Sequence, residues 1–181
     1  MKKANYKIQV TQSSIDWVGR KITGEHNGTI AIKEGNLSLE DGQLTGGKFV
    51  VDSRSIKILD ITDPTTNAQF AGHLASDDFF SSARFPEALL EITSAERNGN
   101  NTYSINGDLT IKGITHPILF NAKLNANGDD TITASGKIVV DRTKYEMKFR
   151  SGNFFQNLGD TLIYNDFTLD VNIAAKMARP F

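Results

Sequence analysis

The stretch "TYSINGDLTIKG", residues 102–113, decides the fold class of this chain. Apolar residues alternate with polar ones along its length, and a period of two is typical of a strand with one buried face. The apolar face consists of Tyr103, Ile105, Gly107, Leu109 and Ile111. This stretch therefore predicts a half-buried β-strand.

The same alternation recurs in seven further stretches, which gives about eight strands in all. Turn signals such as "EDG" at 40–42, "RNGNN" at 97–101 and "NANGDD" at 125–130 separate them. Connections this short favour antiparallel neighbours, so we expect an all-β protein with an antiparallel sheet. The stretches are 13–21, 28–33, 47–52, 88–94, 117–126, 131–142 and 166–175.

Two architectures fit this pattern: a filled β-sandwich, or a closed barrel with room for a ligand. Small residues on the inward faces would leave such room, although glycine in a strand can equally mark a bulge or a corner. The small inward residues are Gly19, Gly107, Ala122, Ala134 and Gly136. They favour the barrel slightly and leave both architectures open.

Length and charge set limits on the function. A chain of 181 residues can bury one core, so we expect a single domain over 1–181. Twenty Lys and Arg against 21 Asp and Glu give a net charge of −1, which does not favour nucleic-acid binding. The absence of cysteine excludes disulfides and thiolate metal sites, and no stretch is apolar enough for a membrane helix.

One segment departs from the strand pattern. In "DPTTNAQFAGHLAS", residues 63–76, Phe70 and Leu74 stand at helical spacing, and Thr65 and Thr66 are candidate N-caps. We predict a short helix over about 65–75. It leads into two adjacent phenylalanines, Phe79 and Phe80, which could not both enter one core from a regular strand.

Three motifs in this order resemble those of the YceI-like family: "VDSRSI" at 51–56, "SDDFFSSARFP" at 76–86 and "DLTIKGITHPI" at 108–118. The segments "KITGEHNGTI" at 21–30 and "SGNFFQNLGD" at 151–160 add to the likeness. The resemblance implies a lipocalin-like antiparallel β-barrel of about eight strands, with the helix covering an end. It also implies binding of a polyisoprenoid or another long amphiphilic lipid in an internal apolar pore. Most members of the family are periplasmic.

The resemblance and the alternation together give a set of expected pore residues. Aromatic and aliphatic side chains bind such a lipid through burial of apolar surface, so no cofactor is needed. The set is Trp17, Phe49, Val51, Phe70, Leu74, Phe79, Phe80, Leu90, Ile92, Leu109, Ile111, Phe120, Phe154, Phe155 and Leu169. An alternative for Phe79 and Phe80 is that both rings only seal the core.

Polar residues at the pore mouth are candidates for contact with a lipid head group, because a phosphate would need cations there. The candidates are His26, Arg54, Arg84 and Arg142. The histidines show no metal-ligand spacing, so we expect no metal site; His73 is expected at the surface and His116 at the start of a strand. No nucleophile motif is present, so we expect no catalytic residue.

The sequence thus predicts binding, carriage or storage of a long-chain amphiphilic lipid without catalysis. Two alternatives stay open: an enzyme that acts on an apolar substrate at the pore mouth, and a filled β-sandwich that serves as an interaction module. A homodimer is compatible with either. We expect a periplasmic location if a signal peptide has been removed from this chain, and a cytoplasmic one otherwise.

Overall fold

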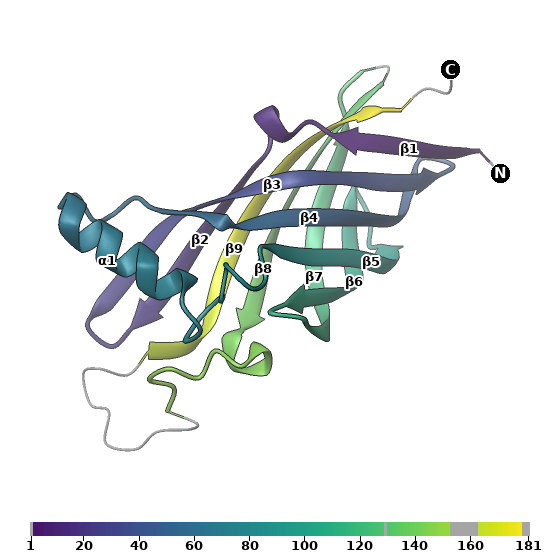
Figure 1. Cartoon of the computed structure of the whole chain (residues 1–181). Helices are drawn as coiled ribbons and strands as arrows, with labels where there is room; N and C mark the ends of the chain where they lie inside the picture. The colour runs from purple at the N-terminus through teal and green to yellow at the C-terminus, as the bar shows by residue number, and fades with distance from the viewer. Residues whose placement is uncertain (1, 129, 153–162, 179–181) are drawn as a thin grey trace.

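The computed structural model describes residues 2–128, 130–152 and 163–178, and it is dominated by long antiparallel strands (Figure 1). One α-helix, α1 (Pro64–Ala75), and two short 3₁₀ helices, η1 (Val10–Gln12) and η2 (Arg142–Tyr145), accompany them. The strands are β1 (Lys3–Ile8), β2 (Ser14–Lys21), β3 (Gly24–Glu40), β4 (Gln43–Ile58), β5 (Glu87–Arg97), β6 (Thr102–Ile111), β7 (Ile114–Ala126), β8 (Thr131–Asp141) and β9 (Ile163–Met177).

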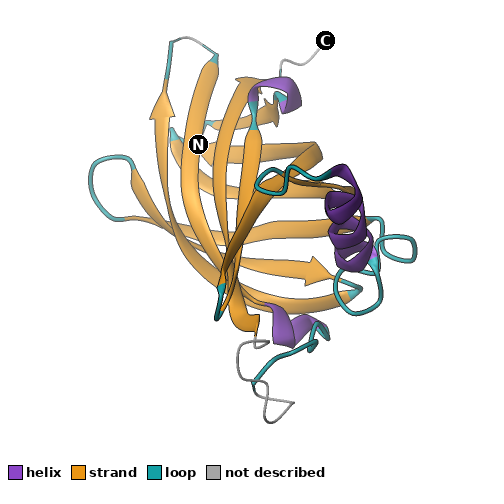
Figure 2. Ribbon diagram, turned by 90° about the vertical axis from the view of Figure 1, so that its left-hand side faces the viewer, coloured by secondary structure: helices purple, strands orange, loops and turns teal. Residues whose placement is uncertain are grey.

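The sheet closes on itself. Its order is β1-β3-β2-β9-β8-β7-β6-β5-β4, and β4 pairs with β3 to complete the ring. Strand β1 pairs with β3 and β9, which are the same two neighbours that flank β2. The chain therefore forms an eight-stranded closed antiparallel barrel in which β1 and β2, separated by η1, share one place. This confirms the predicted barrel and excludes the two-sheet sandwich; Figure 2 shows the strands curving round with α1 outside the sheet.

Two tight hairpins show how local sequence closes the barrel. Asp41 and Gly42 join β3 to β4 with φ angles of 52° and 80°, and Lys112 and Gly113 join β6 to β7 with 55° and 73°. Positive φ at both central residues marks the type I′ turn, whose twist matches that of the flanking strands. Asp-Gly is a favoured pair for this turn, whereas lysine is an uncommon residue there and needs a compensating contact.

Helix α1 begins one residue earlier than expected, and its N-cap is Asp63 rather than Thr65 or Thr66. The Asp63 carboxylate accepts a hydrogen bond from the amide of Thr66 at 2.9 Å, and Pro64 occupies the first turn. A carboxylate satisfies the free amides of a first turn, and proline lacks an amide that would need a partner there. The helix has no fully buried residue, so it rests on the barrel as a cover (Figure 1).

The inward side chains pack in two clusters along the barrel. One gathers near the end that holds β1 and the β3–β4 turn, and the other lies beneath α1 and η2. Phe49, Phe120, Leu169 and Val171 contact both clusters. Several inward residues in the middle are only half-buried, because the space in front of them is hollow.

Candidate functional site: an apolar cavity beneath helix α1

The barrel contains two adjoining cavities. The larger one, here called the outer chamber, has a volume of about 640 Å³ and reaches from the barrel interior to α1. The smaller one, here called the deep chamber, has a volume of about 100 Å³ and lies toward the other end. The outer chamber is within the 300–1,000 Å³ range of small-molecule sites.

Every expected pore residue within the described part of the chain lines one of the two chambers. The outer chamber is lined by Trp17, Val51, Phe70, Leu74, Phe79, Phe80, Leu109, Ile111 and Leu169. The deep chamber is lined by Phe49, Val51, Leu90, Ile92, Leu109, Phe120 and Leu169. Phe154 and Phe155 lie outside the described residues.

The small inward residues separate into two kinds. Gly19 faces open space in the outer chamber, and Ala122, Ala134 and Gly136 line the deep one. Gly107 instead lies opposite Ile92, where the β5–β6 register shifts, and a Cβ there would come within 2.8 Å of the Glu91 carbonyl oxygen. Gly107 therefore allows a close approach of two strands, and so does Gly136, where a Cβ would come within 3.0 Å of the Asn121 carbonyl oxygen. Gly19, Ala122 and Ala134 leave room in the barrel.

The adjacent phenylalanines belong to no strand. Phe79 and Phe80 occupy a turn after α1 in which the Phe80 amide donates to the Leu74 carbonyl and the Ser82 amide to the Ala75 carbonyl. Because the chain turns there, both rings point to the interior: Phe79 is buried, Phe80 is half-buried, and both line the outer chamber. Core packing and cavity lining are thus performed by the same two rings.

Aromatic rings surround the outer chamber beneath α1. His73 lies 4.6 Å from Phe149 and 5.0 Å from Phe79 between ring centroids, and Phe80 lies 6.1 Å from Phe167. We call this group, with Phe70, the aromatic collar. His73, expected at the surface, has a side chain that is 35% exposed and also lines the chamber, and its Nε2 lies 3.1 Å from Asp78 Oδ2. Edge-to-face pairs of this kind hold large apolar area in fixed positions.

His26 is at the edge of the same chamber, on the β2–β3 hairpin. Its Nδ1 lies 2.7 Å from Asp60 Oδ2, and its ring lies 4.8 Å from Phe70 on α1. Burial would raise the pKa of Asp60, but the Asn27 amide and the His26 ring outweigh it and lower that pKa below its usual value. The pair therefore ties the hairpin to the segment that leads into α1.

Arg142 is the buried cation of the site. It is 3% exposed, lines the outer chamber and donates to the carbonyls of Met147 at 2.5 Å, Ile163 at 3.0 Å and Tyr164 at 3.0 Å. Burial lowers its pKa to about 10, and Asp141 opposes that shift. Within the described residues Arg142 forms no ion pair, so its charge rests on carbonyl dipoles and on the Phe79 ring, 5.8 Å away.

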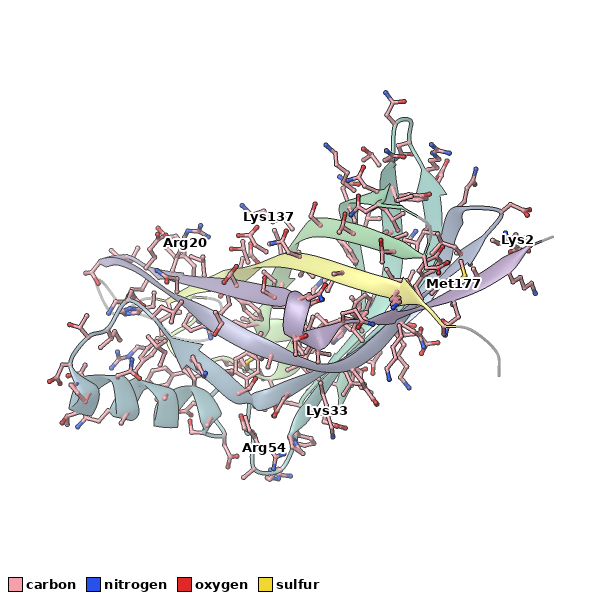
Figure 3. All side chains as sticks on the ribbon, turned by 90° about the horizontal axis from the view of Figure 1, so that it is seen from above. Lys2, Arg20, Lys33, Arg54, Lys137 and Met177 are labelled. Atoms are coloured by element: carbon pink, nitrogen blue, oxygen red, sulfur yellow. The ribbon has the colours of Figure 1, made fainter. Side chains whose placement is uncertain are left out.

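The other two head-group candidates lie elsewhere. Arg54 points away from the barrel beside Asp52, as Figure 3 shows, and Arg84 is exposed with its guanidinium 5.3 Å from the Phe85 ring centroid. Neither lines a chamber. Their positions in the sequence did not indicate direction, because Arg54 falls where the β3–β4 register shifts and Arg84 falls in a turn.

Several polar lining residues escaped the sequence analysis. Arg20 and Lys21 end β2 at the chamber edge, and Arg150, an exposed residue, lines that edge with its guanidinium 4.9 Å from the Phe149 ring centroid. Asp166 adds a carboxylate. Alternation through 141–150 could not find Arg150, because this segment contains η2 and turns rather than a strand.

The lysine of the Leu-Thr-Ile-Lys-Gly motif, Lys112, has a structural role. Its Nζ donates to the carbonyl of Asp77 at 2.9 Å and lies 3.3 Å from that of Glu146, so it ties the β6–β7 turn to the loop before Phe79 and to the end of η2. Burial lowers the pKa of Lys112, while the nearby carboxylates of Asp77 and Glu146 oppose this. These bonds compensate for lysine at positive φ and hold the loop that carries the two phenylalanines.

Within residues 2–128, 130–152 and 163–178, no group of three or more His, Asp or Glu side chains could hold a metal ion. The same residues include no helix long and apolar enough to cross a membrane.

Comparison with known proteins places this architecture in a family. The YceI-like domain model matches residues 6–175. A UPF0312 protein of Photorhabdus laumondii is 30% identical over 169 residues, which are 86% of this chain and 79% of that protein. A UPF0312 protein of Pseudomonas putida is 29% identical over 130 residues, 70% of this chain, and the match spans only 65% of that relative.

Two solved structures share the fold at low identity. A polyisoprenoid binding domain from Saccharophagus degradans has a TM-score of 0.73 at 13% identity and covers 96% of this chain and 98% of its own. Burkholderia cenocepacia BcnA has a TM-score of 0.71 at 17% identity, covering 93% of this chain and 99% of its own. The family match over residues 6–175, on a closed barrel with an apolar cavity, shows that this chain belongs to the YceI-like family.

Proposed function

We propose that this protein binds a long-chain amphiphilic lipid inside the barrel and carries or stores it without chemical change. The observation that carries the proposal is the pair of adjoining cavities, about 640 and 100 Å³, with walls that are almost entirely apolar. Burial of apolar surface contributes roughly 25 cal/mol of favourable binding free energy for each Å² removed from water. The related fold of a polyisoprenoid binding domain supports the same ligand class.

The distribution of polar groups supports one orientation of that lipid. Among the described residues, four cationic side chains line the outer chamber, against one carboxylate, Asp166. One of the four, Arg20, also forms an ion pair with Glu25 at 3.3 Å. Among the described residues on the wall of the deep chamber, the polar side chains are those of Tyr103 and Ser135. An anionic or hydrogen-bond-accepting head group would therefore lie at the outer chamber and the tail would point toward the deep one. The four cations are Arg20, Lys21, Arg142 and Arg150.

A lipid carrier of this kind needs no reacting group, and the polar residues of the mouth serve structural contacts. His26 pairs with Asp60, His73 with Asp78, and Arg142 with three carbonyls. Each of these groups holds a loop or a helix over the cavity. We therefore propose binding rather than catalysis.

The experiment that tests this proposal is native mass spectrometry of the freshly purified protein, followed by organic extraction and identification of the released species. Binding is then followed by the fluorescence of Trp17, the only tryptophan in the chain, which lines the outer chamber. We expect a bound species with a long hydrocarbon chain. A clean apo mass that persists after incubation with polyprenyl phosphates and with fatty acids would contradict the proposal.

A matched pair of variants locates the site. Leu109→Lys places a charge on the wall of both chambers and should abolish lipid retention, whereas Leu119→Lys, at a residue 67% exposed on the outer face of β7, should retain lipid like the parent. Phe79→Ser serves as a second inward variant in case Leu109→Lys does not fold. Equal retention by both folded inward variants and the parent would refute the location.

A further inference from the structure

The two chambers are separate cavities that share part of one wall. Five residues line both of them: Ile15, Val51, Ala88, Leu109 and Leu169. They come from five different strands, β2, β4, β5, β6 and β9, and lie where the two chambers adjoin. We call this group the waist.

The smallest side chain of the waist is that of Ala88. Ala88 and Val51 are paired neighbours on β5 and β4, and both are only half-buried because they face the hollow interior. Leu109 is paired with Leu90, which lines the deep chamber, and Leu169 with Trp17, which lines the outer one. Side chains at this level therefore decide whether a chain can pass from one chamber into the other.

The deep chamber beyond the waist is suited only to the end of a hydrocarbon tail. Its wall includes Ala122 and Ala134, whose small side chains leave the space open, and none of the described residues that line it is charged. An apolar cavity of this kind stays dry when empty. At about 100 Å³, it holds about three chain carbons if each takes roughly the 30 Å³ of one water in the liquid.

From these observations we infer that the waist and the deep chamber measure the length of the lipid tail, with Ala88 as the residue that sets the limit. This inference rests on the proposed function and deepens it. Each methylene that enters the barrel adds about fourfold to the affinity. Affinity therefore rises with tail length until the deep chamber is full, and then stops rising.

The test is a series of saturated fatty acids of increasing length, whose dissociation constants are measured by Trp17 fluorescence for the parent and three variants. Ala88→Leu narrows the waist, so its affinity should stop rising at a tail about three carbons shorter than in the parent. The affinity should fall on the order of 50-fold for the longest acids and stay unchanged for the shortest. Ala88→Val is the milder substitute in case Ala88→Leu does not fold. Leu109→Ala widens the waist, so its affinity should not fall at long tails.

The matched control is Gly19→Val, which fills part of the outer chamber alone, where an added Cβ meets no atom within 4 Å. It should change the affinity for all lengths by one common factor. A break point in Ala88→Leu and Ala88→Val at the same length as in the parent, or a uniform loss at every length, would overturn the inference while lipid binding stands. If the parent binds no acid of any length and native mass spectrometry finds no lipid, the proposed function fails as well.

Discussion

Replacement of Arg142 by methionine tests how the buried cation holds the cavity mouth. The change removes three donors from the carbonyls of Met147, Ile163 and Tyr164, two of which lie at the start of β9. A buried acceptor that loses its partner costs about 1–3 kcal/mol. Methionine carries no charge, so the variant does not bear the cost of desolvating the guanidinium, the effect that lowers the pKa of Arg142 to about 10. This offsets part of the lost stability.

The net loss in the free energy of unfolding of Arg142→Met should be about 3 kcal/mol. For a protein of this size that is a fall of about 6–12 °C in Tm. The assay is urea unfolding followed by circular dichroism, with a thermal scan of the same samples. The rates of amide hydrogen exchange at Ile163 and Met147 should increase together, because the carbonyls of both residues accept hydrogen bonds from the same guanidinium.

Arg142→Lys is the matched control, because it keeps the charge and the stem but replaces the planar fork with a single ammonium. It should lose about half as much stability as the methionine variant. A loss below 1 kcal/mol in Arg142→Met, or equal losses in both variants, would refute the account in which the three hydrogen bonds carry the effect.

Three further outcomes follow from the structure. Gly28→Ala should lower the free energy of unfolding by about 3 kcal/mol and shift the tryptophan emission, because the added Cβ would lie 1.7 Å from the Lys57 carbonyl oxygen and 2.7 Å from the Trp17 ring. Equilibrium unfolding with fluorescence detection measures both effects, and an unchanged emission spectrum would contradict this prediction. Asp60→Asn should be less stable than the parent at neutral pH. Since folding lowers the pKa of Asp60, this difference in the free energy of unfolding should persist at pH values above the usual aspartate pKa and shrink as the pH falls below about 4. Urea unfolding at several pH values measures it, and a difference that stays constant down to the lowest pH would count against the Asp60–His26 pair. Lys112→Met should speed amide exchange at Phe79, whose loop loses a tie, with a cost of about 1 kcal/mol; Lys112→Gln, which can restore one hydrogen bond, is the control, and equal protection in parent and Lys112→Met would contradict the tie.

The sequence did not predict which polar side chains line the cavity mouth and which lie outside the barrel. Arg54 and Arg142 look alike in sequence, since each follows an aspartate within two residues near the end of an alternating stretch. One lies outside the barrel with Asp52 and the other is buried in the wall of the outer chamber. The difference arises because the β4 segment bulges outward near Arg54, whereas the chain after β8 folds back over the barrel end.

The sequence by itself determined eight of the nine strands, their antiparallel pairing and which side chains face inward, because the alternation of apolar and polar residues has the period of the pleat and needs no distant partner. It missed β1 and predicted β3 and β4 as shorter strands than the structure has. It also determined the family, through short motifs such as Leu-Thr-Ile-Lys-Gly. Only the tertiary structure decided that the sheet closes, that the interior holds two adjoining chambers and that Phe79 and Phe80 share one of them. Closure and cavity shape depend on contacts between strands far apart in the chain, such as β3 with β4 and β2 with β9. Such contacts leave no periodic signal in any local stretch.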